Sequence, residues 1–153
     1  MRYFFSVFFI ISYLFSYSQW QPSEYILKKR NVELKKLYDF DFQLKETEFN
    51  ENYYYIIFDN KNIGYLCLRQ APSKHDIFDY MVVFDNSIKI KHIKILAYRE
   101  DYGGEISARR WLSQFYKREI KDVQAISGAT ISVNSLKQDI SKLNQEIKVW
   151  AKK

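Results

Sequence analysis

The stretch Tyr53-Tyr54-Tyr55-Ile56-Ile57-Phe58 consists of six aromatic and β-branched residues, a composition typical of a β-strand. It is followed by Asp59-Asn60-Lys61-Asn62, whose polar side chains favour a turn. The apolar pattern resumes over residues 63–69. We therefore predict an antiparallel hairpin, and with it a fold built around a β-sheet.

Further strands are predicted on both sides of this hairpin. Before it, apolar residues alternate at Phe40, Phe42 and Leu44 and predict a short strand. After it, residues 71–76 are predicted to form a polar loop, and strands are expected over residues 80–84 and 88–98. In the last strand the apolar residues change parity, which a β-bulge near His92 would explain.

Helical periodicity marks the two ends of the chain. Ser23 is placed to cap a first helix, and a short amphipathic helix is expected around Trp111 and Phe115. The clearest stripe lies near the C-terminus, at Val133, Leu136, Ile140, Leu143, Ile147 and Trp150. Strands followed by helices predict an α+β fold, a twisted and mainly antiparallel sheet with packed helices.

Composition excludes several classes of protein. The chain has 153 residues, of which 47% are hydrophobic, so it can bury the core of one domain. Its single cysteine, Cys67, excludes an internal disulfide and is expected to be buried on a strand. Two histidines, His75 and His92, argue against a multi-histidine zinc site, and no metal site is predicted.

The N-terminus has the features of a signal peptide. A positive start at Arg2 precedes an apolar run over residues 3–15, which is too short to cross a bilayer comfortably. Small residues at Ser16 and Ser18 predict cleavage before Gln19, with an uncleaved anchor as the alternative. Either outcome places the remaining chain in the periplasm or on the outer face of the membrane. Because an exported protein seldom meets nucleic acid, we expect no nucleic-acid partner despite the net charge of +6. The positive charge would instead attract an anionic membrane or ligand.

Three of the four glycines lie in two loops between predicted elements, residues 98–105 and 125–132. The second loop runs directly into the last helix, whose first N–H groups favour a bound anion. Hydroxyl groups at Ser127, Thr130 and Ser132 would add hydrogen bonds. A phosphate site is one interpretation; in the other, Ser132 caps the helix and Gly128 forms a turn. The residues alone leave both open.

The second loop, Ser127-Gly128-Ala129-Thr130-Ile131-Ser132, resembles the signature of the FMN-binding domain family. This family includes the flavin-carrying subunits of the Rnf and sodium-pumping NADH–quinone oxidoreductase complexes. The first loop, with Glu100, Tyr102, Gly103 and Gly104, and the helix around Trp111 agree with the family in order. The resemblance covers roughly residues 53–147. We therefore expect a signal peptide over residues 1–18, an N-terminal extension over residues 19–52 and an FMN-binding domain over residues 53–153.

The resemblance also implies a role for each loop. Thr130 matches the threonine that a separate flavin transferase joins to FMN through a phosphoester bond. Ser127, Gly128, Ala129, Ile131 and Ser132 would shape the loop around the phosphate, while Glu100, Tyr102, Gly103 and Gly104 would line the flavin ring. Arg109 or Arg110 would neutralise phosphate charge. Gln124 departs from the family pattern, which has an acidic residue there, and leaves non-covalent FMN as the alternative.

The expected function is extracytoplasmic or membrane-associated electron transfer. The flavin would exchange electrons with a redox partner protein or a membrane quinol system. Two alternatives stay open: a stand-alone flavin reductase, and a flavin-free secreted interaction protein with the same fold. The departure at Gln124 favours the last of these.

Overall fold

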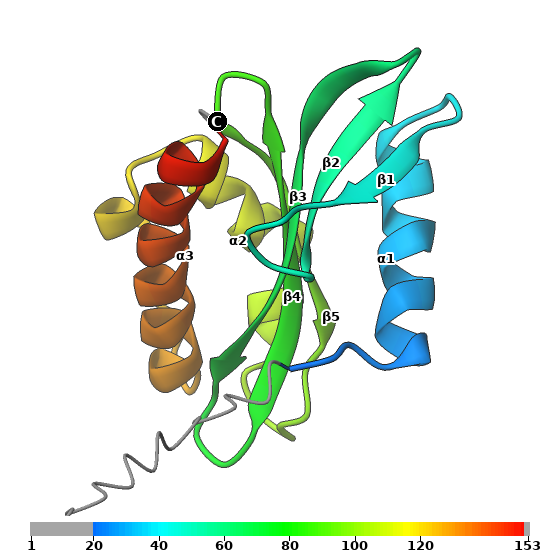
Figure 1. The fold of residues 1–153 in the computed structure, drawn as a ribbon. Coiled ribbons are helices and arrows are strands. Elements are labelled where there is room, and N and C mark those ends of the chain that lie inside the picture. Colours follow the sequence, from blue (N-terminus) through cyan, green and yellow to red (C-terminus); the bar gives the residue numbers. More distant parts are fainter. Residues whose placement is uncertain (1–19, 152–153) are drawn as a thin grey trace, which may run out of the picture.

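A five-stranded sheet forms the centre of the protein, and every strand pairs antiparallel with its neighbour in the chain (Figure 1). The computed structural model describes residues 20–151. The strands are β1 (Gln43–Glu46), β2 (Tyr53–Phe58), β3 (Lys61–Pro72), β4 (Ile77–Asp85) and β5 (Ile90–Ala97). The predicted α+β fold is confirmed.

Helical segments lie before and after the sheet. They are α1 (Glu24–Leu37), the 3-10 turns η1 (Gly104–Ser107), η2 (Ser113–Tyr116) and η3 (Ile120–Asp122), and the α-helices α2 (Arg109–Leu112) and α3 (Thr130–Trp150). Ser23 caps α1 as predicted, because its hydroxyl accepts a hydrogen bond from the Ile26 N–H at 3.4 Å. Within the described residues, none of the helices has the length and apolarity needed to cross a membrane.

The sheet is covered on both faces, by α3 on one and α1 on the other (Figure 1). Successive strand residues point to opposite faces, so β3 contributes to two cores. Tyr65 and Cys67 join the cluster under α3, whereas Leu66 and Leu68 join the cluster under α1. The prediction that Cys67 is buried on a strand is therefore confirmed.

The predicted helical stripe of α3 is also confirmed. All six of its apolar residues are buried against the sheet. The helix predicted around Trp111 is shorter than expected, because it ends at Leu112 and continues as the 3-10 turn η2. Trp111 and Phe115 are nevertheless buried, as predicted.

Several strand boundaries differ from the prediction: β3 and β4 are longer than expected, and β5 is shorter. The first strand begins at Gln43, because Phe40 lies outside it and packs on Phe58 with 4.3 Å between ring centroids. The polar loop expected from residue 71 begins later, because Ala71 and Pro72 pair with Phe78 and Ile77. The antiparallel ladder thus continues through residues whose side chains alone suggested a loop.

The predicted bulge is confirmed beside His92. Val83 pairs with His92 and Phe84 pairs with Ile90, so Lys91 is the extra residue. The bulge returns Ile93 and Ile95 to the face under α3. The predicted signal peptide, residues 1–18, lies outside the described residues.

Candidate functional site

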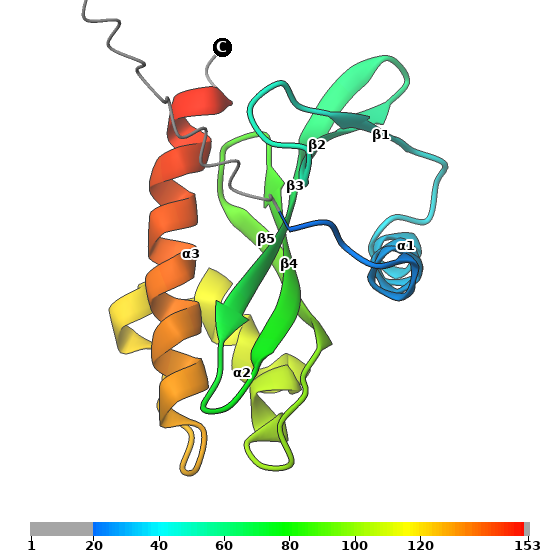
Figure 2. The same ribbon diagram turned by 60° about the horizontal axis from the view of Figure 1, so that its bottom comes forward.

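Both glycine-containing loops lie at one end of the molecule, together with the turn between β3 and β4 (Figures 1 and 2). Gly103 marks their closest approach. A Cβ atom added to Gly103 would lie 2.8 Å from the Cβ of Ala129, which is closer than side-chain carbons pack. The absence of a side chain at Gly103 therefore lets the first loop rest directly against the second.

Backbone conformation explains why both loops contain glycine. Gly103 and Gly128 each have a φ of 80°, in the left-handed region that other residues rarely adopt. Gly128 sits in the tight turn before α3, where the Ala129 N–H donates to the Ile126 carbonyl at 3.2 Å. The glycine turn of the sequence interpretation is confirmed.

The first turn of α3 has no side-chain cap. The N-cap residue is Ala129, whose methyl group cannot accept a hydrogen bond. Within residues 20–151, the N–H groups of Thr130 and Ile131 have no acceptor. These groups lie at the positive end of a 21-residue helix and can bind an anion.

Ser132 does not cap the helix, so that part of the capping interpretation is wrong. It lies inside the first turn with 3% of its surface exposed. Its hydroxyl is 3.0 Å from the hydroxyl of Tyr98, which follows β5. Ser132 therefore joins the two loops from inside, and the sequence could not reveal this role because Tyr98 is distant in the chain.

The side chains that remain accessible at the start of α3 are Ser127, Thr130 and Ile131. The Thr130 hydroxyl makes no hydrogen bond to any of residues 20–151, and it stands at the first position of the helix. Tyr102, on the neighbouring loop, is 83% exposed. This group of side chains can contact a ligand without prior rearrangement of the core.

The Glu100 carboxylate is hydrogen-bonded to the turn between β3 and β4. Its Oε1 accepts hydrogen bonds from the Ser73 hydroxyl at 2.5 Å and from the backbone N–H groups of His75 and Asp76 at 2.6 and 3.2 Å. These bonds, led by that of Ser73, lower the pKa of the Glu100 carboxyl. The predicted contact of Glu100 with a flavin ring stays a prediction, whereas its link to the β3–β4 turn was not anticipated.

The base of the first loop is held by a buried charge. Asp79 is 1% exposed and forms an ion pair with Arg99, which also donates to the Ile77 carbonyl at 2.8 Å. The other carboxylate oxygen accepts from the Gln70 side chain at 2.6 Å. Asp79 is therefore fully paired, and the first loop leaves β5 in a fixed direction.

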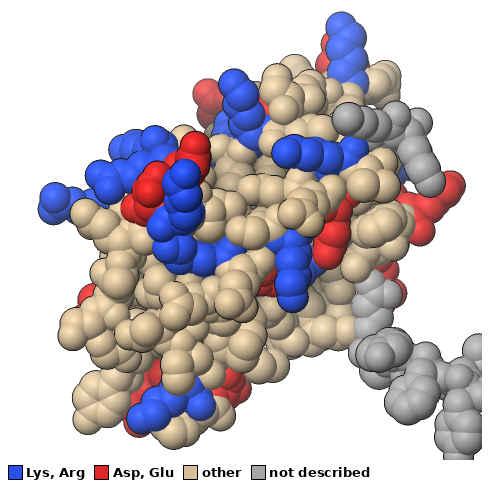
Figure 3. Space-filling view, turned by 90° about the vertical axis from the view of Figure 1, so that its left-hand side faces the viewer, with Lys and Arg blue, Asp and Glu red and all other residues tan. Residues whose placement is uncertain are grey.

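An open pocket of about 470 Å³ lies beside the two loops. Its walls include Glu105, the last residue of the first loop, with Ala108 just after it, and Ile126 of the second loop, with Gln124 just before it. The remaining walls come from α2 and the residues after it: Arg110, Trp111, Ser113, Gln114, Lys117 and Arg118. The volume is in the range of small-molecule sites, and Arg110, Lys117 and Arg118 make its walls basic. Lys and Arg side chains also project from the face drawn in Figure 3.

Gln124 is fixed through its backbone. The Trp111 indole N–H donates to the Gln124 carbonyl at 2.8 Å, and the Gln124 N–H donates to the Gln114 side chain at 3.1 Å. The Gln124 side chain is left exposed at the pocket wall. Arg110 lines this pocket, whereas Arg109 lines a different one beside α1. None of the predicted FMN contacts lines either of these two pockets, so a role of Arg109 or Arg110 in neutralising the phosphate stays a prediction.

A comparison with known protein families finds a match, and it covers the region of the two loops. The family model of the FMN-binding domain matches residues 74–143. The chain contains an FMN-binding domain. The matched segment runs from the β3–β4 turn into α3, and it includes both loops and all residues that line the open pocket. No curated protein matches the chain at the significance required.

The FMN-binding domain indicates FMN as the cofactor. The structure fits this group at one point in particular, the uncapped start of α3 with its exposed Thr130. A phosphate there would satisfy N–H groups that no side chain of the described residues satisfies. The protein is accordingly a flavin-binding protein.

Proposed function

We propose that the protein is exported and takes part in extracytoplasmic or membrane-associated electron transfer, with its FMN joined to Thr130 through a phosphoester bond. The observation that carries the attachment is the Thr130 hydroxyl, accessible and unpaired within residues 20–151, at the uncapped start of α3. When bound, FMN supplies the redox chemistry.

The attachment requires a flavin transferase and a flavin donor with a leaving group, such as FAD. Thr130 would supply its Oγ1 to the flavin-bearing phosphorus, the pyrophosphate P–O bond would break with release of AMP, and the hydroxyl proton would leave. No electron is gained or lost in this step. The N–H groups of Thr130 and Ile131 would then be available to hold the ester phosphate and offset its charge.

Several residues support a role in electron transfer to a partner protein or a membrane quinol. Tyr102, the predicted contact of the flavin ring, is 83% exposed, so a flavin beside it would remain within reach of a second molecule. Arg110, Lys117 and Arg118 give the wall of the open pocket a positive charge, which favours an acidic partner surface. The fully paired Asp79 fixes the first loop and would keep the flavin environment rigid.

The deciding experiment is co-production of the protein with a flavin transferase, followed by a denaturing gel and a native absorbance spectrum. We expect a flavin-fluorescent band, which Thr130→Val abolishes and Thr130→Ser retains in part. Ser127→Ala is the matched control, because it removes an exposed hydroxyl three residues away. The exported location is tested separately by fractionation of the producing cells.

Each other outcome contradicts a part of the proposal. Retained fluorescence in Thr130→Val would exclude the attachment site. A yellow native sample with a dark band would exclude the covalent bond, and restored fluorescence in Gln124→Asp would then identify Gln124 as its cause. A colourless sample would favour the flavin-free interaction protein.

A further inference from the structure

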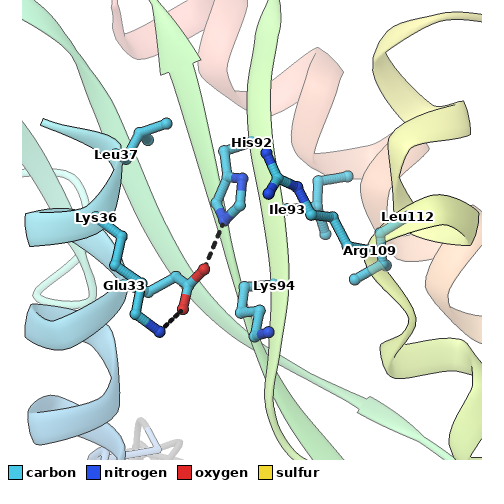
Figure 4. Close-up of a pocket in the computed structure, with 8 residues that line it drawn as sticks. All are labelled: Glu33, Lys36, Leu37, His92, Ile93, Lys94, Arg109 and Leu112. Carbon is cyan, nitrogen blue, oxygen red and sulfur yellow. Dashed lines mark hydrogen bonds and ion pairs between the residues drawn. The ribbon is translucent and has the colours of Figure 1, made fainter.

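A second pocket lies beside the edge strand β5 (Figure 4). It has a volume of about 130 Å³ and is enclosed by three elements. α1 contributes Glu33, Lys36 and Leu37, β5 contributes His92, Ile93 and Lys94, and α2 contributes Arg109 and Leu112. None of these residues belongs to the site described above.

The charge in this pocket is unbalanced. Three cationic side chains, Lys36, Lys94 and Arg109, line it together with one carboxylate, that of Glu33. Glu33 is shared, since its oxygens lie 3.5 Å from both the Lys36 ammonium and the His92 Nε2. Within residues 20–151, Lys94 and Arg109 have no ion-pair partner, so positive charge remains unsatisfied.

His92 is central to the pocket. Its side chain is 14% exposed and points toward Glu33, and the Arg109 guanidinium extends toward it from α2 (Figure 4). The Nε2 atom is buried and makes no hydrogen bond within the described residues. The nearest acceptor is a Glu33 oxygen at 3.5 Å, which is too far for a good hydrogen bond, so a ligand that bonds to the ring would recover free energy.

These features favour an anion over a metal ion. The described residues place no third His, Cys, Asp or Glu near Glu33 and His92, so a cation would have too few ligands. The surrounding Lys36, Lys94 and Arg109 would also repel it. An oxyanion, by contrast, can accept hydrogen bonds from all three cations and from the protonated imidazole.

We propose that the pocket between α1, β5 and α2 is a binding site for a small soluble oxyanion, of which inorganic phosphate is the type. The anion would bridge Lys94 and Arg109 beside His92 and thereby connect α1 to the flavin-binding domain. This site is separate from the FMN phosphate site, because it lies beside α1 and uses Arg109 in place of Arg110.

The binding should be visible in the titration of His92. Burial, followed by the charges of Lys94 and Arg109, lowers the pKa of this imidazole, while Glu33 acts in the opposite direction. A bound anion stabilises the protonated ring and raises that pKa. By linkage, phosphate should bind more tightly as the pH falls through the pKa of His92.

The test follows the imidazole C–H resonances of the purified protein over pH, in chloride and in phosphate at equal ionic strength. We expect phosphate to raise the pKa of His92. His75 is the other histidine of the chain, is exposed, and serves as the internal control. Acetate as a third anion separates a tetrahedral oxyanion site from one for any carboxylate.

Variants identify the residues responsible. Arg109→Gln and Lys94→Gln should each weaken phosphate binding about tenfold, which corresponds to ~1.4 kcal/mol. Arg110→Gln removes the same charge from the adjacent residue, outside this pocket, and should leave the His92 response intact. Equal His92 titrations in phosphate and chloride would overturn the proposal, as would equal losses in Arg109→Gln and Arg110→Gln.

Discussion

Gly103 and Gly128 share a φ of 80° but differ in their surroundings. A Cβ atom on Gly103 would meet Ala129 at 2.8 Å, whereas one on Gly128 would have no neighbour within 4 Å. At Gly103 the missing side chain therefore serves both conformation and packing. At Gly128 it serves conformation alone and leaves space beside the helix start for a ligand.

This difference predicts unequal effects of the same substitution. Gly128→Ala should cost about 1 kcal/mol, the penalty of a left-handed backbone. Gly103→Ala should cost about 3 kcal/mol, because overpacking against Ala129 adds to that penalty. Urea unfolding of both variants measures the two free energies. Equal losses of stability would show that the first loop moves away from Ala129 at no energetic cost.

The lowered pKa of Glu100 predicts a pH dependence of stability. Because the folded pKa lies below the unfolded one, the Glu100 carboxylate stabilises the fold above its unfolded pKa and loses this effect as the pH falls through the folded pKa. Glu100→Gln should therefore be less stable than the parent protein at neutral pH and equal to it in acid. Urea unfolding at several pH values tests this, and a constant difference would contradict it.

The sequence predicted the residues of the site better than their contacts. It placed the glycine turn correctly just before the last helix, whereas the contact of this loop with a phosphate stays a prediction. It could not predict that Ser132 turns inward to Tyr98, or that Glu100 bonds to Ser73, because both partners are distant in the chain. A polar side chain is thus recognised from its type, while its partner is decided by tertiary packing.

At the scale of elements, α3 is fastened to the sheet by a polar network as well as by its apolar stripe. Arg69 on β3 pairs bidentately with Asp139 and also with Glu146 at 2.9 Å. The hydroxyl groups of Tyr53 and Tyr80 complete the network. Burial, followed by the charge of Asp139, raises the pKa of the Tyr80 hydroxyl, so it stays a hydrogen-bond donor.

Breaking this network should be costly. Arg69→Met should destabilise the fold by about 3 kcal/mol, because Asp139 would keep a mostly buried charge without its partner. Adding Asp139→Leu should restore part of the loss. Thermal or urea unfolding of the single and double variants measures the coupling.

The exposed pair of Lys121 and Glu119 provides the comparison. Lys121→Met should change stability by less than about 1 kcal/mol, since exposed ion pairs contribute little. A loss as large as that of Arg69→Met would indicate that charge in general, and not the buried network, holds α3 in place.

Strand boundaries were the least predictable feature of the elements. The alternation of Phe40, Phe42 and Leu44 correctly indicated apolar contact, but Phe40 makes that contact from a loop. Ala71 and Pro72 have low strand propensity and still complete β3, because β4 supplies their partners. The bulge beside His92 was predictable, since one extra residue in a strand reverses the parity of the side chains that follow it.

At the scale of the whole molecule, α1 covers one face of the sheet, although the helix itself lies outside the matched residues 74–143. Its buried residues Ile26 and Leu34 pack in a cluster with Leu66, Leu68 and Met81. The α+β class followed from the order of strands and helices, but the position of α1 did not, because its periodicity reveals only that one side is apolar. The predicted boundary at residue 53 stays a prediction.

The contribution of α1 to stability can be measured at two positions of the same helix. Leu34→Ala should cost about 3 kcal/mol, because Leu34 is fully buried. Val32→Ala should change stability by less than about 0.5 kcal/mol, because Val32 is 53% exposed. If urea unfolding gave equal small effects, the flavin-binding domain would not depend on α1.

The ion pair of Arg69 and Asp139 crosses the limit of the family match, since Arg69 precedes residue 74 and Asp139 lies within the matched segment. If only residues 74–143 were transferred into a relative, the chimera would receive Asp139 without Arg69. Grafting the flavin-carrying segment onto another chain requires a cation in the receiving strand, so the transferable unit is longer than the segment by which the family is recognised.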